Sequence, residues 1–179
     1  MKSTAMILVV LFASTTSTIA QENELSKKFG FGGHLNQYQN DFGLGVNLSS
    51  PYFMSEQLTI RVRANMAWNE HLNSTNEMTW TSYSSVSLGC ASVAGMVGEF
   101  IRLYGEGGVL ILFPSEEFSS SSQEIGGYGL FGFEFFMNEH ANYYVEIGGV
   151  GMGANADKIA GNPIYSNGYL MSVGFRYQL

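Results

Sequence analysis

The residues best suited to acid–base or metal chemistry in this sequence are its three histidines, His34, His71 and His140. They lie far apart, without the paired spacing of a zinc site, and have no cysteine partner. A hydrolase or acyltransferase also needs a histidine beside a serine and an acid. His71, with Glu70 and Ser74 nearby, is the least unsuitable candidate, and a solvated loop histidine is the simpler interpretation. We therefore expect no catalytic residue, no metal and no cofactor.

Three glycine-rich runs, at residues 29–33, 105–108 and 148–153, superficially resemble phosphate-binding loops. A phosphate loop needs a following helix and a suitably placed lysine, and neither pattern is present. Glycine within a strongly curved strand is the simpler explanation, because it relieves crowding where a narrow barrel bends. Nucleotide binding is therefore not expected.

Charged residues form the most regular chemical pattern in the chain. Seven of them sit one residue away from apolar neighbours, so in a β-strand the charges and the apolar side chains would point to opposite faces. They are Arg61, Arg63, Arg102, Glu106, Glu134, Glu146 and Arg176. We expect all seven to share an enclosed polar face. We also expect Arg102, Glu134, Glu146 and Arg176, on neighbouring strands, to form one continuous belt of ion pairs.

Alternation of apolar and small or polar residues defines the elements that must position these charges. The clearest example is 58–68, and the last twelve residues, 168–179, alternate up to the C-terminus. The fourth segment is less regular, because Ser82 and Ser84 share the face of Trp80, so a bulge or a shifted register is possible there. The eight expected strands are 29–36, 42–48, 58–68, 78–90, 99–113, 124–137, 143–148 and 168–179.

An even number of such strands can close into an antiparallel barrel with both ends of the chain on one side. Connections after the third, fifth and seventh strands are the longer polar ones, at residues 69–77, 114–123 and 154–167. The pattern therefore predicts an all-β fold, an eight-stranded antiparallel up-and-down transmembrane β-barrel. Aromatic residues should form girdles at its two lipid interfaces. The expected interface aromatics are Trp68, Trp80 and Phe113 at the outer side and Phe135, Tyr143 and Tyr177 at the inner side.

The N-terminus has the features of an export signal. Lys2 precedes a short apolar run and small residues end at Ala20, so we expect a signal peptide over 1–20, a short segment over 21–28 and one barrel domain over 29–179. Removal of the signal changes the net charge from −7 to −8, which disfavours nucleic acid as a partner. The single cysteine excludes an intramolecular disulfide.

With these strands placed, the chain resembles the small outer-membrane β-barrel proteins of Gram-negative bacteria, of the outer membrane protein X type and of the barrel part of the outer membrane protein A type. The resemblance rests on the segments 102–109, 132–136, 144–148 and 172–177. It departs from the usual pattern at Leu179, where such barrels commonly end in Phe. It implies residence in the outer membrane, contact with lipid and lipopolysaccharide, and insertion by the barrel-assembly machinery.

These observations leave several functions open. The first is a structural or surface-interaction role, with a plugged polar interior and outer loops that contact a protein partner. This interpretation is favoured because an eight-stranded barrel is only wide enough for side chains to fill it. A narrow porin-like channel, with the charged belt as its gate, is the alternative. A lipid-modifying membrane enzyme and a soluble periplasmic binder of the lipocalin kind are less well supported.

Overall fold

The computed structural model describes residues 28–179 except 40, 74–76, 99, 118, 139 and 160. The expected signal peptide and all but the last residue of the segment 21–28 lie outside the described part of the chain. The eight strands are β1 (Gly30–Tyr38), β2 (Asp41–Ser49), β3 (Leu58–Leu72), β4 (Met78–Val97), β5 (Ile101–Phe113), β6 (Glu124–Phe136), β7 (Ala141–Gly151) and β8 (Gly168–Gln178). None of the described residues forms a helix with the length and hydropathy needed to cross a membrane.

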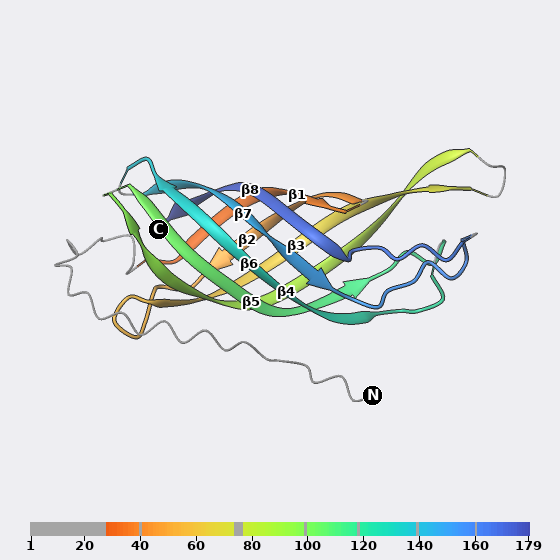
Figure 1. Ribbon diagram of the computed structural model, residues 1–179, viewed down its shortest axis with the longest axis horizontal. Helices are drawn as coiled ribbons and strands as arrows, with labels where there is room; N and C mark the ends of the chain where they lie inside the picture. Colours follow the sequence, from red (N-terminus) through yellow and green to blue (C-terminus); the bar gives the residue numbers. More distant parts are fainter. Residues whose placement is uncertain are drawn as a thin grey trace, which may run out of the picture.

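The strands form a closed barrel in which each pairs with its neighbour in the sequence and β8 returns to β1 (Figure 1). Every pairing is antiparallel, including the closing one between Phe31 and Tyr177. The predicted eight-stranded antiparallel barrel is therefore confirmed. The C-terminus and the β2–β3, β4–β5 and β6–β7 connections lie at one end of the barrel (Figure 1). The β1–β2 turn and the β3–β4, β5–β6 and β7–β8 connections lie at the other, which we call the loop end.

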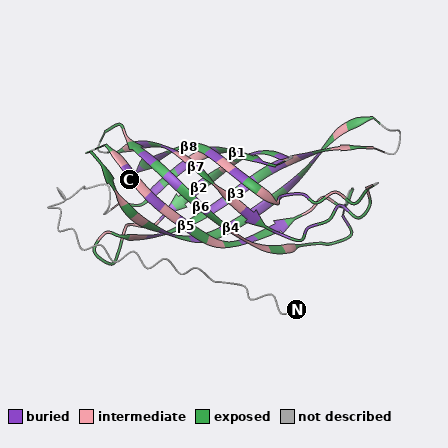
Figure 2. Cartoon of the chain, viewed as in Figure 1, coloured by how far each residue is buried: buried purple, intermediate pink, exposed green. Residues whose placement is uncertain are grey.

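Burial alternates along the strands, most regularly in β1, β3 and β8, as Figure 2 shows. In the central part of β3, Arg61, Arg63 and Asn65 are buried, whereas Val62 and Met66 are exposed. The buried positions point into the barrel and the exposed ones point away from it. Because successive side chains of a strand take opposite faces, this alternation in the sequence fixes which residues can meet inside.

The structure differs from the sequence prediction mainly around β4. The strand continues past its expected end at residue 90 and ends only at Val97, because pairing with β5 extends to Val97. No bulge or shifted register is present near Ser82, because residues 78–92 pair with β3 in continuous register. A register shift lies instead between Val93 and Gly95, past the end of the expected strand. The predicted loop 69–77 is also shorter than expected, because β3 and β4 continue as a two-stranded hairpin to Leu72 and Met78. This hairpin projects past the rest of the barrel (Figure 1).

Candidate functional site: the barrel interior and its outer mouth

The seven predicted charged residues all lie inside the barrel, and none is more than 6% exposed. Four of them form what we call the central ion cluster: Arg61, Arg63, Glu106 and Glu146. Arg63 donates to both Glu146 oxygens at 2.6 and 2.8 Å and to Glu106 Oε2 at 2.7 Å. Arg61 donates to the same Glu106 oxygen at 2.9 Å. Two arginines and two glutamates from β3, β5 and β7 thus balance in charge across the barrel axis.

The other three charges form a separate group, the terminal ion cluster, near the end that carries the C-terminus. Arg176 Nη1 donates to Glu134 Oε1 at 2.5 Å, and Arg102 Nη1 donates to Glu134 Oε2 at 3.3 Å. The Arg102 guanidinium also lies over the rings of Tyr52 and Phe136, at 4.6 and 4.7 Å. One carboxylate therefore serves two arginines, and aromatic rings cover the less tightly paired one.

The predicted single belt is wrong for Glu146, which belongs to the central ion cluster. On the paired strands β7 and β8, Glu146 lies opposite Ser172 and Arg176 lies opposite Asn142. The two charges are thus four positions apart, roughly 13 Å along the strands at about 3.3 Å per residue. Glu146 instead crosses the interior to Arg63. Adjacency of strands suggested the belt, but the register decides which charges meet.

Two tyrosines, Tyr104 and Tyr144, separate the clusters, and neither was singled out from the sequence. Arg61 lies over the Tyr104 ring at 4.3 Å and Arg176 over the Tyr144 ring at 4.7 Å, distances at which a cation is attracted to a ring face. The Tyr104 hydroxyl donates to Glu146 at 2.6 Å. Each ring lies against a glycine of a neighbouring strand. A Cβ at Gly132 would come within 2.2 Å of the Tyr104 ring, and one at Gly174 within 2.5 Å of the Tyr144 ring.

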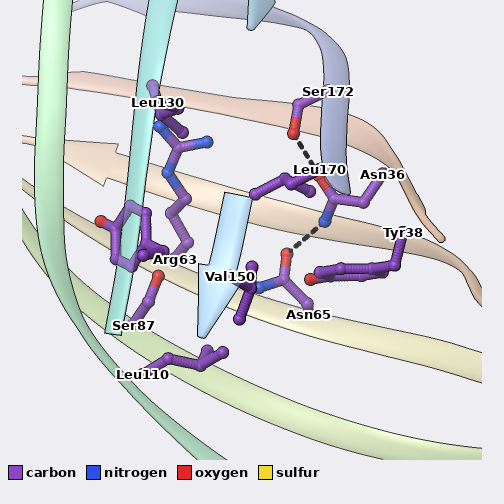
Figure 3. A pocket seen from close by; sticks show the side chains of 11 residues that line it. Asn36, Tyr38, Arg63, Asn65, Ser87, Leu110, Leu130, Val150, Leu170 and Ser172 are labelled. Atoms are coloured by element: carbon purple, nitrogen blue, oxygen red, sulfur yellow. Dashed lines mark hydrogen bonds between the residues drawn. The ribbon is translucent and has the colours of Figure 1, made fainter. Parts of the chain in front are cut away.

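From the central ion cluster toward the loop end, the next interior side chains are uncharged polar groups. Ser172 donates to Asn36 at 2.6 Å and Asn36 donates to Asn65 at 2.9 Å, as Figure 3 shows. These side chains share a cavity of about 20 Å³ with Leu130 and Val150 (Figure 3). That volume suits about one or two water molecules. Closer to the loop end, apolar side chains fill the barrel, including Leu110, Leu112, Leu170 and Met152.

Asp41 organises the outer mouth of the barrel, although it lies just outside the expected strand 42–48. It is 1% exposed and accepts hydrogen bonds from Asn69 Nδ2 at 2.5 Å, from the Tyr83 hydroxyl at 2.6 Å and from the Ser166 backbone N–H at 2.7 Å. Tyr83 also meets Tyr165 edge to face at 5.3 Å. The carboxylate thus ties the connection between β7 and β8 to the barrel wall. Asp41 is an even number of residues from Gly43 and Asn47, so extending the expected strand by one residue would have predicted that its side chain points into the barrel.

The connections β5–β6 and β7–β8 form a single cap over this mouth. The Ser120 backbone N–H donates to Asp157 at 2.8 Å, and the Ser120 hydroxyl donates to the same carboxylate. These hydrogen bonds hold the pKa of Asp157 below its ordinary value. Beneath them Ala154, Ala156 and Tyr165 are buried, and burial raises the pKa of Tyr165 to about 12. These three residues of the β7–β8 connection belong to the same hydrophobic cluster as Leu112 and Leu170, so the connection continues the core of the barrel.

The three histidines occupy unrelated places. His34 is inside the barrel, with Nε2 2.6 Å from Asn65 Oδ1 and Nδ1 3.4 Å from Asn47 Nδ2. His71 lies on the projecting hairpin, 2.8 Å from the Thr81 hydroxyl, and His140 stacks on Tyr177 at the opposite end. The described residues contain no group of three or more His, Cys, Asp or Glu side chains placed to hold a metal.

The predicted interface aromatics all point away from the interior. Their exposed fractions range from 36% for Phe135 to 53% for Trp80 and Tyr143, with Trp68 half-buried. Trp68 and Phe113 lie toward the loop end of their strands, and Tyr143 and Tyr177 toward the opposite end.

Comparison with known proteins connects this architecture to solved structures. A scan against protein-family models found no match, and a search of curated proteins found none either. Among solved structures, the chain is similar to the N-terminal β-barrel domain of Pseudomonas aeruginosa OprF, with a TM-score of 0.59 and 12% sequence identity. The alignment covers 86% of this chain and 98% of that domain. At this identity the likeness shows a shared fold, a closed barrel of the kind found in that N-terminal domain.

Proposed function

We propose that this protein is an integral outer-membrane β-barrel with a structural or surface-interaction role. The observation that carries the proposal is the apolar outer face of the barrel, because all eight strands turn large apolar side chains away from the interior. One such residue per strand, each between 39% and 54% exposed, is Leu35, Leu44, Val62, Leu88, Val109, Phe131, Ile147 and Val173. Exposed apolar surface on this scale is unfavourable in water and favourable in lipid.

The placement of charge supports the same environment. Within the described strands, the only acidic or basic residue on the outer face is Glu70, which lies beyond the last pair between β2 and β3. A basic side chain on the lipid face costs about 2 to 4 kcal/mol near the bilayer midplane. A soluble barrel of the lipocalin kind would have the reverse arrangement, with apolar side chains inside and charges outside.

The packed interior favours a structural role over a channel. The two ion clusters span the barrel, and apolar side chains and the cap close its outer half. We therefore expect the refolded protein to show no steady conductance steps in a planar bilayer. Regular steps would instead favour the narrow channel.

We also propose that lipid and lipopolysaccharide surround the barrel, that the barrel-assembly machinery inserts it, and that the loop end contacts a protein partner.

The native Cys90 offers a direct test of the membrane placement. It is the only cysteine, it is exposed on the outer face of β4, and it lies opposite Ile60 and Gly107 in the middle of the apolar surface. In isolated native membranes a membrane-impermeant maleimide should leave Cys90 unlabelled, because lipid covers the thiol. Boiling in SDS should then make the same thiol reactive.

A matched control places a cysteine on the cap. In a Cys90→Ser background, Glu117→Cys changes an exposed loop residue and should be labelled in intact membranes. Equal labelling rates at the two positions would show that water, not lipid, contacts the middle of the barrel wall and would refute the proposal.

A further inference from the structure

A solvent-open hollow of about 460 Å³ lies at the loop end, between the β1–β2 turn and the last part of the β7–β8 connection. Its lining includes Gln39 from the β1–β2 turn, Asn162 and Asn167 from the β7–β8 connection, and Asp41. The volume falls within the range of small-molecule sites, about 300 to 1,000 Å³.

The hollow is built on a fixed support. Asp41 is almost fully buried and is held by Asn69, Tyr83 and the Ser166 backbone. In the β7–β8 connection, the Asn162 N–H donates to Ile159 O at 3.0 Å and the Asn167 side-chain oxygen accepts from the Met152 N–H at 2.9 Å. Such a prearranged site loses less conformational entropy when a ligand binds.

The chemistry of the lining indicates the class of ligand. No lysine or arginine lines the hollow, so an anion would have no counter-charge. Its one carboxylate, Asp41, already accepts three hydrogen bonds, which makes it a poor ligand for a free cation. Side-chain amides supply both donors and acceptors, and Pro163 and Ile164 add a small apolar surface.

We propose that this hollow binds an uncharged polyhydroxylated ligand, specifically a sugar unit. Hydroxyl groups pair with the donors and acceptors of Gln39, Asn162 and Asn167, and the C–H face of a sugar ring packs on Pro163 and Ile164. The inference goes beyond the proposed function and depends only on the geometry of the loop end.

The test uses the full-length protein in a detergent without a sugar head group, because a glycosidic detergent would compete. Glucose, galactose and maltose are titrated separately while backbone and side-chain amide signals are followed by NMR. The expected result with at least one of them is a saturable shift confined to Gln39 and the segment 161–167. Gln39→Ala and Asn162→Gly should each raise the dissociation constant about threefold to tenfold, as loss of one hydrogen bond would.

Glycine at 162 removes the amide while keeping the left-handed backbone, since Asn162 has φ of 44°. Gln123→Ala changes an exposed glutamine on the neighbouring connection, outside the hollow, and should leave the dissociation constant unchanged. The proposal is overturned if none of the three sugars gives a saturable shift, or if the shifts are indifferent to both hollow variants. Saturation by calcium or inorganic phosphate in place of the sugars would also overturn it.

Discussion

At the scale of single residues, the buried charges are where the sequence was most informative and also where it reached its limit. Alternation correctly predicted that all seven charged residues point inward, because a strand has only two faces. It could not predict which charges pair, because that depends on strand register and on contacts across the barrel. Arg63 with Glu146 is such a contact, 83 residues apart in the sequence.

In the terminal ion cluster, removing the Glu134 side chain should lower the free energy of unfolding more than removing that of Arg102. Glu134→Ala leaves Arg102 and Arg176 without their shared carboxylate, and an uncompensated buried charge costs about 3 to 5 kcal/mol. Arg102→Ala leaves the shorter Arg176 contact in place and should cost less. Urea unfolding of the two variants in lipid vesicles measures the difference. Equal losses, or a new selective conductance in either variant, would contradict the view that these charges pack the interior.

The cap should loosen in acid through Asp157. Its pKa is lower in the folded state than in an unfolded chain, where it is about 3.9. The contact with Ser120 is therefore at full strength above that value and is lost as the pH falls through the lower folded pKa. NMR of the Ser120 amide across this range should show the transition, and Asp157→Asn should abolish it. An unchanged Ser120 signal down to pH 2 would contradict this contact.

At the scale of the elements, glycines that face into the barrel differ from glycines that face outward. The high glycine content of the sequence does not distinguish these two sets. Inward-facing glycines make room for neighbours, as Gly132 does for Tyr104. Outward-facing ones, such as Gly107 and Gly129, which pair across β5 and β6, meet nothing closer than 3.7 Å. Relief of crowding therefore explains the first set. The structure gives no steric reason for the second.

Adjacent positions of β5 test this distinction. A Cβ at Gly108 would lie 2.2 Å from the Leu88 backbone oxygen, whereas one at Gly107 would lie 3.7 Å from its nearest neighbour, Tyr128 O. Gly108→Ala should lower the yield of refolded barrel or its free energy of unfolding by more than 1 kcal/mol, since ~1 to 3 kcal/mol is usual for overpacking. Gly107→Ala should be neutral within about 0.5 kcal/mol. The reverse order would show that the outer face is the crowded one.

The β7–β8 connection should depend on Asp41 for its position. Asp41→Ala removes the acceptor for three buried donors, so the connection should become open to protease between residues 152 and 167 while the barrel stays folded. Asp41→Asn keeps one acceptor oxygen and should have a smaller effect. Limited proteolysis of membrane-embedded protein measures this directly. Cleavage rates equal to those of the unaltered chain would show that other contacts hold the cap.

At the scale of the whole molecule, strand number, pairing order and the direction of each face followed from the sequence, since a period of two together with turn signals leaves few alternatives. The extent of β4, the projecting hairpin and the cap could not be predicted from the sequence. Residues 91–97 are small or apolar without clear alternation, and pairing with β5, together with β3 at residues 91 and 92, makes them a strand. The cap depends on contacts such as Ser120 with Asp157, which no local pattern encodes.

The central claim is that this closed barrel resides in an outer membrane with its apolar face toward lipid. Fractionation of native membranes, followed by gel migration with and without boiling, tests it most directly. We predict enrichment in the outer membrane and faster migration of the unboiled protein, because a closed barrel resists detergent until it is heated. A protein recovered in the soluble periplasmic fraction, with identical migration before and after boiling, would contradict the claim.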